Sequence, residues 1–410
     1  MSQPQWIEVT PVNEHAEVTR RQFAQTYGHE PSAVWGAPGR VNLIGEHLDY
    51  NGGSVLPIAL PHLTAMAVGR APADHAGAAS AEARVSSAHG GQTVRFSLAE
   101  LASGSVTGWA SYVAGVIWAM SEAGWDVPAI ELYVDGRVPV GAGLSSSAAL
   151  TCSTALAVAQ ASQAPADWPW TSVNDDGARR ALAAACIRAE NEFAGAPTGG
   201  MDQSAAMRAS AGHAMLLDCA SFDIDQISWP AEAELLVVDT RSNHSLIDGQ
   251  YGGRREACER AAELLGVASL AAIDMADLEA TLARLPDAEL QGVVRHVITE
   301  TDRVARVAAG LPSGDLTAAG EALFESHASM RDDFVISTPE LDRVVADARE
   351  AGALGARMTG GGFGGSAVVL CRPGTATKIG EHIHRGAEQM NHPAPGLMQV
   401  LPSRAAFRLG

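Results

Sequence analysis

The sequence predicts an α+β protein of two domains, on the basis of three observations. The chain has 410 residues, of which 47% are apolar and 18% charged, so it is too long for one small domain and can form two or three cores. Strand and helix signals are mixed without a regular strand–helix–strand alternation, which favours α+β over a doubly wound sheet. Strand signals dominate the first third, and the second half has its own mixture. We therefore expect domains at 1–210 and 211–410.

Short apolar runs bounded by Gly, Pro or Asp predict the strands, and apolar residues at helical spacing predict the helices. In the first half the expected strands are 33–37, 55–60, 62–70, 93–97 and 130–135, and the expected helices are 16–28, 106–123, 145–160 and 175–193. In the second half the expected strands are 213–218, 235–239 and 367–371, and the expected helices are 254–265, 291–309, 315–331, 339–351 and 376–389.

Charge excludes several classes of function. The net charge of −19 argues against a nucleic-acid surface and against binding to anionic membranes, because both need a basic patch. Lys378 is the only lysine, which removes the Walker loop and the protein-kinase strand lysine from consideration. An anionic small molecule can still bind at arginines and helix N-termini.

Cysteine spacing and the N-terminus indicate the compartment. The five cysteines are odd in number and lack paired metal-ligand spacing, so neither a disulfide framework nor a zinc site is indicated. The N-terminus lacks a basic region followed by an apolar one, and no apolar run is long enough to span a membrane. These features predict a cytoplasmic protein.

The segment 36–50, Gly-Ala-Pro-Gly-Arg-Val-Asn-Leu-Ile-Gly-Glu-His-Leu-Asp-Tyr, carries dense ionisable chemistry between two apolar runs. Its candidate ligand-binding residues are Arg40, Glu46, His47 and Asp49. Loops on a rigid scaffold are common binding sites, and the glycines and proline here favour such a loop. The alternative is a solvated loop with a structural Arg–Asp pair.

A second segment, 139–150, leads from an expected strand through glycines into a helix of small residues. Backbone N–H groups and the helix dipole make such a junction an anion site, and the serines add hydroxyl donors or a magnesium ligand. The candidate phosphate-binding residues are Gly141, Gly143, Leu144, Ser145, Ser146 and Ser147. The alternative is an ordinary serine N-cap after a glycine turn.

Two further segments complete the expected site. Residues 359–366, Thr-Gly-Gly-Gly-Phe-Gly-Gly-Ser, precede an apolar strand and can pack against phosphates or against the serine loop. Glu190 lies near an expected helix end, and Asp202 follows a turn rich in Pro and Gly. The two carboxylates are therefore candidates for a metal ligand and for the group that meets an acceptor hydroxyl. Asp202 is the better candidate for the second role, although it could be only a helix N-cap.

Taken together, these segments resemble a known family. The first resembles the galactokinase signature, and the serine and glycine segments resemble the phosphate-binding and third motifs of the superfamily of galactokinase, homoserine kinase, mevalonate kinase and phosphomevalonate kinase (GHMP kinases). Their order and spacing match over nearly the whole chain. His244-Ser245-Leu246, and Tyr251 followed by Arg254-Arg255, resemble galactokinases in particular.

The resemblance implies a two-domain GHMP-kinase-like fold with the active site in the cleft between domains. It implies ATP-dependent phosphorylation of the C1 hydroxyl of D-galactose, with ATP and Mg²⁺ as cofactors. The implied sugar-binding residues are Arg40, Glu46, His47, Asp49, Gly199, Asp202 and Tyr251, with Glu46 at the C6 hydroxyl and Asp49 at the C3/C4 side. The implied magnesium ligands are Ser146 and Glu190, and the implied catalytic residues are Asp202 and Arg40.

The chain departs from the family pattern at two positions. Leu48 replaces a usual threonine between His47 and Asp49, which puts the fine shape of the pocket in doubt. Thr151 replaces a common glutamate, and we expect no effect because this position lies on the helix beyond the phosphate-facing N–H groups.

Three other functions are considered as alternatives. The first is a related kinase for N-acetylgalactosamine, arabinose, mevalonate or homoserine, although the last two lack a ring of hydroxyls for Glu46, His47 and Asp49 to bind. The second is a galactose- and ATP-binding sensor without turnover, which should show damage at Arg40, Asp202 or the serine loop. The third is a dinucleotide-dependent oxidoreductase, which fails because no acidic residue ends a following strand at the expected spacing.

Overall fold

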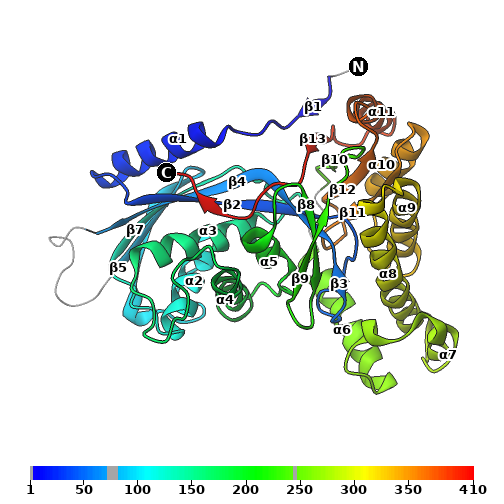
Figure 1. The fold of residues 1–410 in the computed structure, drawn as a ribbon, viewed down its shortest axis with the longest axis horizontal. Coiled ribbons are helices and arrows are strands. Elements are labelled where there is room, and N and C mark those ends of the chain that lie inside the picture. The colour runs from blue at the N-terminus through cyan, green and yellow to red at the C-terminus, as the bar shows by residue number, and fades with distance from the viewer. Residues whose placement is uncertain (1–2, 72–81, 243–246) are drawn as a thin grey trace.

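The computed structural model describes residues 3–71, 82–242 and 247–410. This part of the chain forms a six-stranded, a five-stranded and a three-stranded sheet with helices packed on them (Figure 1). Among the described strand pairs, only β1–β13 and β5–β7 are parallel. The α+β class is thus confirmed, and the second half contributes its own sheet and helices, as expected.

The six-stranded sheet belongs mainly to the first half and has the order β14-β2-β4-β7-β5-β6. Its strands are β2 (Ala33–Asn42), β4 (Pro57–Arg70), β5 (Glu82–Ser87), β6 (Gly90–Ser97), β7 (Ile130–Gly136) and β14 (Phe407–Arg408). The helices around it are α1 (Val12–Tyr27), α2 (Ala110–Glu122), α3 (Ser146–Ala161), α4 (Asp176–Arg188) and α5 (Met201–Arg208).

Helices cover both faces of this sheet, which explains why its strands β2, β4 and β7 are almost uniformly buried. Ala65 and Ala67 of β4 face α1, where they pack with Phe23. Their neighbours Met66 and Val68 face the opposite side and pack in the core with α2 and α3. Figure 1 shows α1 on one side of the sheet and α2 to α5 on the other.

The five-stranded sheet has the order β1-β13-β10-β12-β11. Its strands are β1 (Gln5–Trp6), β10 (Glu234–Asp239), β11 (Gly355–Thr359), β12 (Ser366–Cys371) and β13 (Gly396–Val400). The helices of this half are α6 (Ile247–Leu265), α7 (Leu278–Leu282), α8 (Ala288–Ser313), α9 (Leu316–Asp332), α10 (Pro339–Glu350) and α11 (Ala376–Gln389). The helices expected at 339–351 and 376–389 agree with α10 and α11 within one residue.

The remaining elements are short. The three-stranded sheet consists of β3 (Ser54–Val55), β8 (His213–Asp218) and β9 (Ile224–Ser228). Short 3₁₀ helices occupy Leu98–Glu100, Leu270–Ala272 and Met275–Asp277. The helix expected over 175–193 is α4 followed by a π-helical turn, Ala189–Ala194. Single π turns are frequent at functional sites, and this one carries Glu190.

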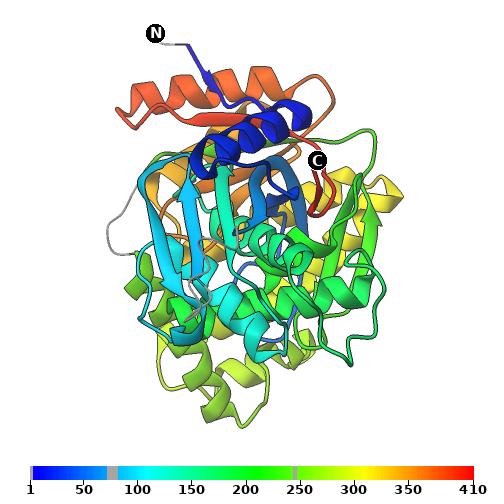
Figure 2. The ribbon, with the colours of Figure 1, turned by 90° about the vertical axis from the view of Figure 1, so that its left-hand side faces the viewer.

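Both ends of the chain cross between the halves. β1, at the N-terminus, pairs with β13 in the sheet of the second half, and β14, at the C-terminus, pairs with β2 in the sheet of the first half. Figure 2 shows the N-terminal segment running from α1 to α11 and β13 of the second half. The largest core also joins residues of both halves, such as Ile44 and Val237. The division into 1–210 and 211–410 remains a prediction, and strands β1 and β14 each pair with the sheet of the other half.

Candidate active site

Both halves of the chain line one cavity of about 500 Å³. The expected site residues that line it are Arg40, Glu46, His47, Asp49, Ser147, Glu190, Asp202 and Tyr251. Gly360 and Gly361 of the glycine segment lie in the same wall. The expected residues outside the lining are Gly141, Gly143, Leu144, Ser145, Ser146 and Gly199.

Asp202 and Arg40 form an ion pair at this cavity. Asp202 lies in the first turn of α5, after Gly200 with φ of 94°. Arg40 follows a bulge in β2. Its Nε and Nη2 each lie 2.7 Å from Oδ1 of Asp202, and its Nη1 donates to the carbonyl of Gly143 at 2.7 Å. One guanidinium thus joins the candidate reacting carboxylate to the serine loop.

Ser145 has a place that the sequence did not indicate. It precedes α3 with φ of 59°, and its hydroxyl donates to Oδ2 of Asp202. Both carboxylate oxygens of Asp202 are therefore held, one by Arg40 and the other by Ser145. The sequence assigned Ser145 to phosphate, and no local pattern linked it to a residue 57 positions away.

The serine and glycine segments pack against each other. A Cβ at Gly360 would lie 3.3 Å from the carbonyl oxygen of Gly143, and one at Gly365 would lie 3.2 Å from that of Ala142. The hydroxyl of Ser366 donates to the same Ala142 carbonyl at 2.7 Å. Glycine permits this close approach because it has no side chain.

The backbone of the serine loop needs glycine as well. Gly141 and Gly143 have φ of 80° and 71°, which other residues adopt only at a cost. Leu144 buries its side chain, and its carbonyl accepts from the backbone N–H of Arg40 at 3.1 Å. Ser146 begins α3, so the N–H groups of this first turn have no partner within the helix.

His47 is a neutral aromatic wall of the cavity. Its ring centroid lies 5.3 Å from that of Tyr251 and 4.7 Å from that of Phe334, and its Nδ1 lies 2.7 Å from the hydroxyl of Tyr50. Burial lowers the pKa of His47 to about 3, so the ring is uncharged at neutral pH. Burial also raises the pKa of the Tyr251 phenol, which stays protonated.

Asp49 and Gly199 fit together closely. A Cβ at Gly199 would lie 2.2 Å from Oδ2 of Asp49, so a larger residue there would displace the carboxylate. Burial, together with the nearby charge of Asp202, raises the pKa of Asp49 to about 6. Asp49 is therefore mostly ionised at neutral pH and can accept hydrogen bonds from hydroxyl groups.

Glu46 is buried and tied to the protein by four donors. Oε1 accepts from the Thr359 hydroxyl at 3.0 Å and the Gly360 N–H at 2.9 Å, and Oε2 accepts from the Asn42 amide at 2.8 Å and pairs with Arg357. Burial raises the pKa of Glu46, an effect that Arg357 opposes. The sequence singled out Glu46 but gave no sign of Arg357, which lies 311 positions later.

Glu190 combines a buried carboxylate with an oxygen-rich surrounding. Its Oε1 accepts from the Thr151 hydroxyl at 3.0 Å and the Gln203 amide at 2.8 Å. Burial raises the pKa of Glu190 to about 7, and the nearby charge of Asp202 adds to this rise. Oxygen ligands suit Mg²⁺, and Ser147, rather than the expected Ser146, lines the cavity together with Glu190.

The two departures from the family pattern have different outcomes. Leu48 is fully buried in the core, and its side chain is not part of the cavity lining. Thr151 was expected to be without effect, but it bonds directly to Glu190. Helical spacing places Thr151 one turn after Ser147, and this four-residue step was the available signal.

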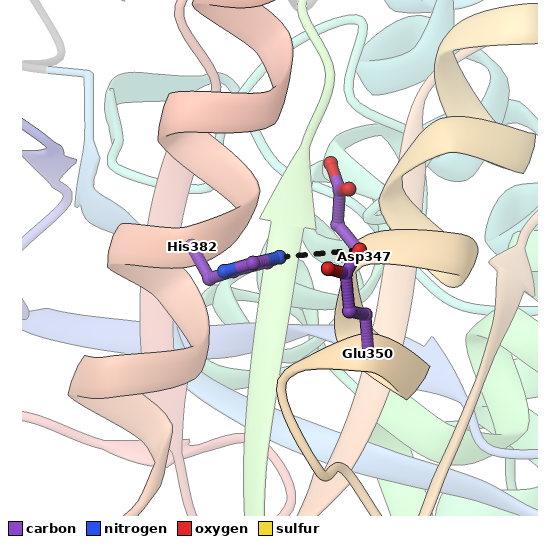
Figure 3. A group of neighbouring side chains, drawn as sticks. All are labelled: Asp347, Glu350 and His382. Carbon is purple, nitrogen blue, oxygen red and sulfur yellow. Dashed lines mark ion pairs between the residues drawn. The ribbon is translucent and has the colours of Figure 1, made fainter.

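A second group with metal-ligating side chains lies on α10 and α11 (Figure 3). Ligand atoms of Asp347, Glu350 and His382 lie within 4.8 Å of one another. However, Arg343 binds both oxygens of Asp347, at 2.7 and 2.8 Å, and Glu350 is 72% exposed. A guanidinium therefore already neutralises the one buried carboxylate, and the group joins two helices.

Comparisons with known proteins show to which family the chain belongs. Family models match at residues 21–70 (galactokinase galactose-binding signature), 111–210 (GHMP kinases N terminal domain) and 307–388 (GHMP kinases C terminal). A galactokinase of Streptomyces coelicolor is 46% identical, with 95% of this chain and 97% of that protein covered. The galactokinase of Bos taurus is 40% identical, with 89% and 90% covered. The chain belongs to the galactokinase family.

Solved structures agree with this assignment. The crystal structure of Lactococcus lactis galactokinase complexed with galactose has a TM-score of 0.85 at 26% identity and covers 95% of this chain and 99% of its own. Methanococcus jannaschii mevalonate kinase, at 14% identity and a TM-score of 0.61, shares the fold. The chain is therefore a kinase with the GHMP fold, as the sequence predicted.

Two further expectations concern the segment at 244–246 and membrane-spanning helices. His244-Ser245-Leu246 lies outside the described residues. Among the helices that the structure describes, none combines the length and apolar character needed to cross a membrane.

Proposed function

We propose that this chain transfers the γ-phosphoryl group of ATP to the C1 hydroxyl of D-galactose. The observation that carries the proposal is the contact chain from Asp202 through Arg40 to Gly143, which joins two residues of the cavity to the serine loop. Phosphoryl transfer depends mainly on alignment and charge stabilisation, and this chain of contacts supplies both.

The sugar would lie among Glu46, His47, Asp49 and Tyr251, with Asp202 at its C1 hydroxyl. Ionised Asp49 accepts from sugar hydroxyls, neutral His47 can donate or accept, and the Tyr251 ring supplies an apolar face. Gly199 contributes by leaving room for Asp49. Glu46 already has four protein donors, so it would meet the C6 hydroxyl while holding Thr359 and Gly360 in place.

The nucleotide phosphates would lie on 141–147, where the free N–H groups of the first turn of α3 favour an anion. Glu190 and Ser147, with Ser146 nearby in the same turn, are the oxygen donors that would hold Mg²⁺. When bound, this ion would neutralise phosphate charge and orient the γ-phosphoryl group. Thr151 and Gln203 hold Oε1 of Glu190 and so fix the direction of its other oxygen.

Asp202 would accept the hydrogen bond of the C1 hydroxyl and orient the oxygen for attack. Arg40, fixed between Asp202 and Gly143, would stabilise the charge that develops on the transferred group. Arg40 and Ser145 both donate to the Asp202 carboxylate and so fix its direction for this contact.

We also place the protein in the cytoplasm. All five cysteines are buried and free, which is usual for a reducing compartment and supports this part of the proposal.

The test is ADP release from Mg-ATP with galactose, N-acetylgalactosamine, glucose, arabinose, mevalonate and homoserine. The proposal requires release that depends on galactose and that falls by several powers of ten in Asp202→Asn. Asp225→Asn, an exposed residue of β9, is the matched control and should leave the rate unchanged. Galactose binding without ADP release would instead indicate a sensor, and a preference for another acceptor would indicate a related kinase.

A further inference from the structure

The loop 43–48 that carries Glu46 and His47 has a backbone that needs support. Gly45 has φ of 101°, and His47 has φ of 64° although it is not glycine. A non-glycine residue in this region costs free energy and persists only where the surroundings hold it. The support must come from groups that contact this loop.

That support comes from the second half of the chain. Glu300, on α8, accepts from the backbone N–H of Gly45 at 3.0 Å. Arg357, on β11, donates to the carbonyl of Leu43 at 3.1 Å and forms an ion pair with the Glu46 carboxylate. His296, also on α8, lies with Nε2 3.2 Å from the carbonyl of Glu46 and donates to it. α8 and β11 thus hold the loop at Leu43, Gly45 and Glu46.

Glu300 and Arg357 are fully buried and do not line the cavity. Glu300 also accepts from the Ser326 hydroxyl at 2.7 Å and from Nε of Arg303 at 2.7 Å, and its Oε1 lies 3.8 Å from Nη2 of Arg357. Two glutamates and two arginines therefore neutralise one another beneath the loop. Buried ion pairs contribute little net stability compared with apolar packing, so stability alone does not account for this cluster.

We propose that Glu300 and Arg357 are positioning residues for the sugar. They set the affinity of the site for galactose by fixing the backbone of loop 43–48, and they do not contact the sugar themselves. The inference rests on the proposed function. Glu300 and Arg357 should affect the affinity for galactose and not the affinity for the nucleotide. Among the contacts that the structure describes, theirs reach the loop that carries His47, and none reaches the serine loop.

The first test compares Glu300→Leu with Glu300→Gln. Both variants remove the charge, but glutamine keeps an acceptor oxygen for the Gly45 N–H. Leucine should raise the KM for galactose by about tenfold or more, as expected for loss of a hydrogen bond to a charged acceptor. Glutamine should stay within about threefold of the unchanged protein, and the KM for ATP should change by less than about twofold in both.

Calorimetry with galactose alone measures the same effect without turnover. The dissociation constant for galactose should follow the KM in each variant. Glu325→Leu and Glu325→Gln provide the control, because Glu325 forms an exposed ion pair with Arg306 on the neighbouring helices α9 and α8. Neither control should change either KM.

If Glu300→Leu fails to fold, Arg357→Lys tests the positioning role instead. Lysine keeps the buried positive charge but cannot reach the Leu43 carbonyl and the Glu46 carboxylate with a planar fork. It should raise the KM for galactose by at least about fivefold, with the KM for ATP unchanged.

Two results would overturn the inference. One is that the KM values for galactose and ATP rise together, and the other is that Glu300→Gln is as damaging as Glu300→Leu. Failure of the unchanged protein to release ADP with galactose would refute the proposed function instead, and calorimetry would still test the positioning role.

Discussion

Gly199→Ala should weaken galactose binding strongly, although Gly199 is not in the lining of the cavity. The added Cβ would lie 2.2 Å from Oδ2 of Asp49, while ordinary contact begins at 3.4 Å. The carboxylate must therefore move by about 1.2 Å, the difference between these two distances. Displacement of a positioned group by about 1 Å can cost about 10²-fold in rate, so we expect kcat/KM for galactose to fall by about that factor.

Steady-state kinetics with galactose and ATP varied separately measure this effect. The KM for galactose should carry most of the loss, because the sugar hydroxyls lose their acceptor, while the KM for ATP should stay unchanged. Gly90→Ala is the control, since an added Cβ there meets nothing within 4 Å. A kcat/KM for galactose within threefold of the unchanged protein would show that Asp49 does not bind the sugar.

The remaining predictions concern Arg40, the proposed magnesium ligand Glu190 and the ion pair of His29 with Glu131. Arg40→Ala should lower kcat at saturating substrates by about 10³-fold, the size seen when an arginine that stabilises phosphoryl transfer is lost, and an unchanged kcat would show that this residue is only structural. Thr151→Val should raise the Mg²⁺ concentration needed for half-maximal activity, because Glu190 loses a donor that fixes its direction; Mn²⁺ binding measured by electron paramagnetic resonance should weaken in parallel, and unaltered binding would contradict this role. Although burial lowers it, the pKa of His29 is raised overall by its bond of 2.6 Å to Glu131, so the extra stability is fully present below the unfolded pKa of about 6.5 and is lost as the pH rises through the folded pKa. The difference in Tm between the unchanged protein and His29→Gln should accordingly shrink from pH 6 to pH 9, and a constant difference would exclude the ion pair as its source.

The local features of the fold could be predicted from the sequence because their signals are local. The apolar spacing of α10 and α11 and the apolar run of β12 each lie within one segment. The three glycine-rich or charged segments that meet at the cavity were likewise visible, because turn-forming residues and ionisable groups are rarely concentrated beside strands without a ligand. The residues themselves suggested that the serine and glycine segments form one cleft, and the family resemblance placed the charged segment 36–50 in the same site.

The contacts that hold the site together could not be predicted. Arg357 pairs with Glu46, and Ser145 donates to Asp202, although the two residues of each pair are far apart in the sequence. No sequence motif around these residues indicates the partner. A buried arginine in a strand otherwise resembles an exposed one in sequence, because charge alone does not show burial. Thr151 is the exception, since helical spacing from Ser147 places it on the same face.

The exchange of the two terminal strands has a consequence for the order in which the protein matures during synthesis. β1 is synthesised long before its partner in β13, Gly396–Leu397, because almost 400 residues separate the two strands. The free edge of β2 also waits for Phe407 and Arg408 of β14. Neither sheet can be completed until β13 and β14 have been made, so a nascent chain keeps two open edges that can pair wrongly. Loss of the last residues would leave the first half, which carries the sugar loop, with an unprotected edge.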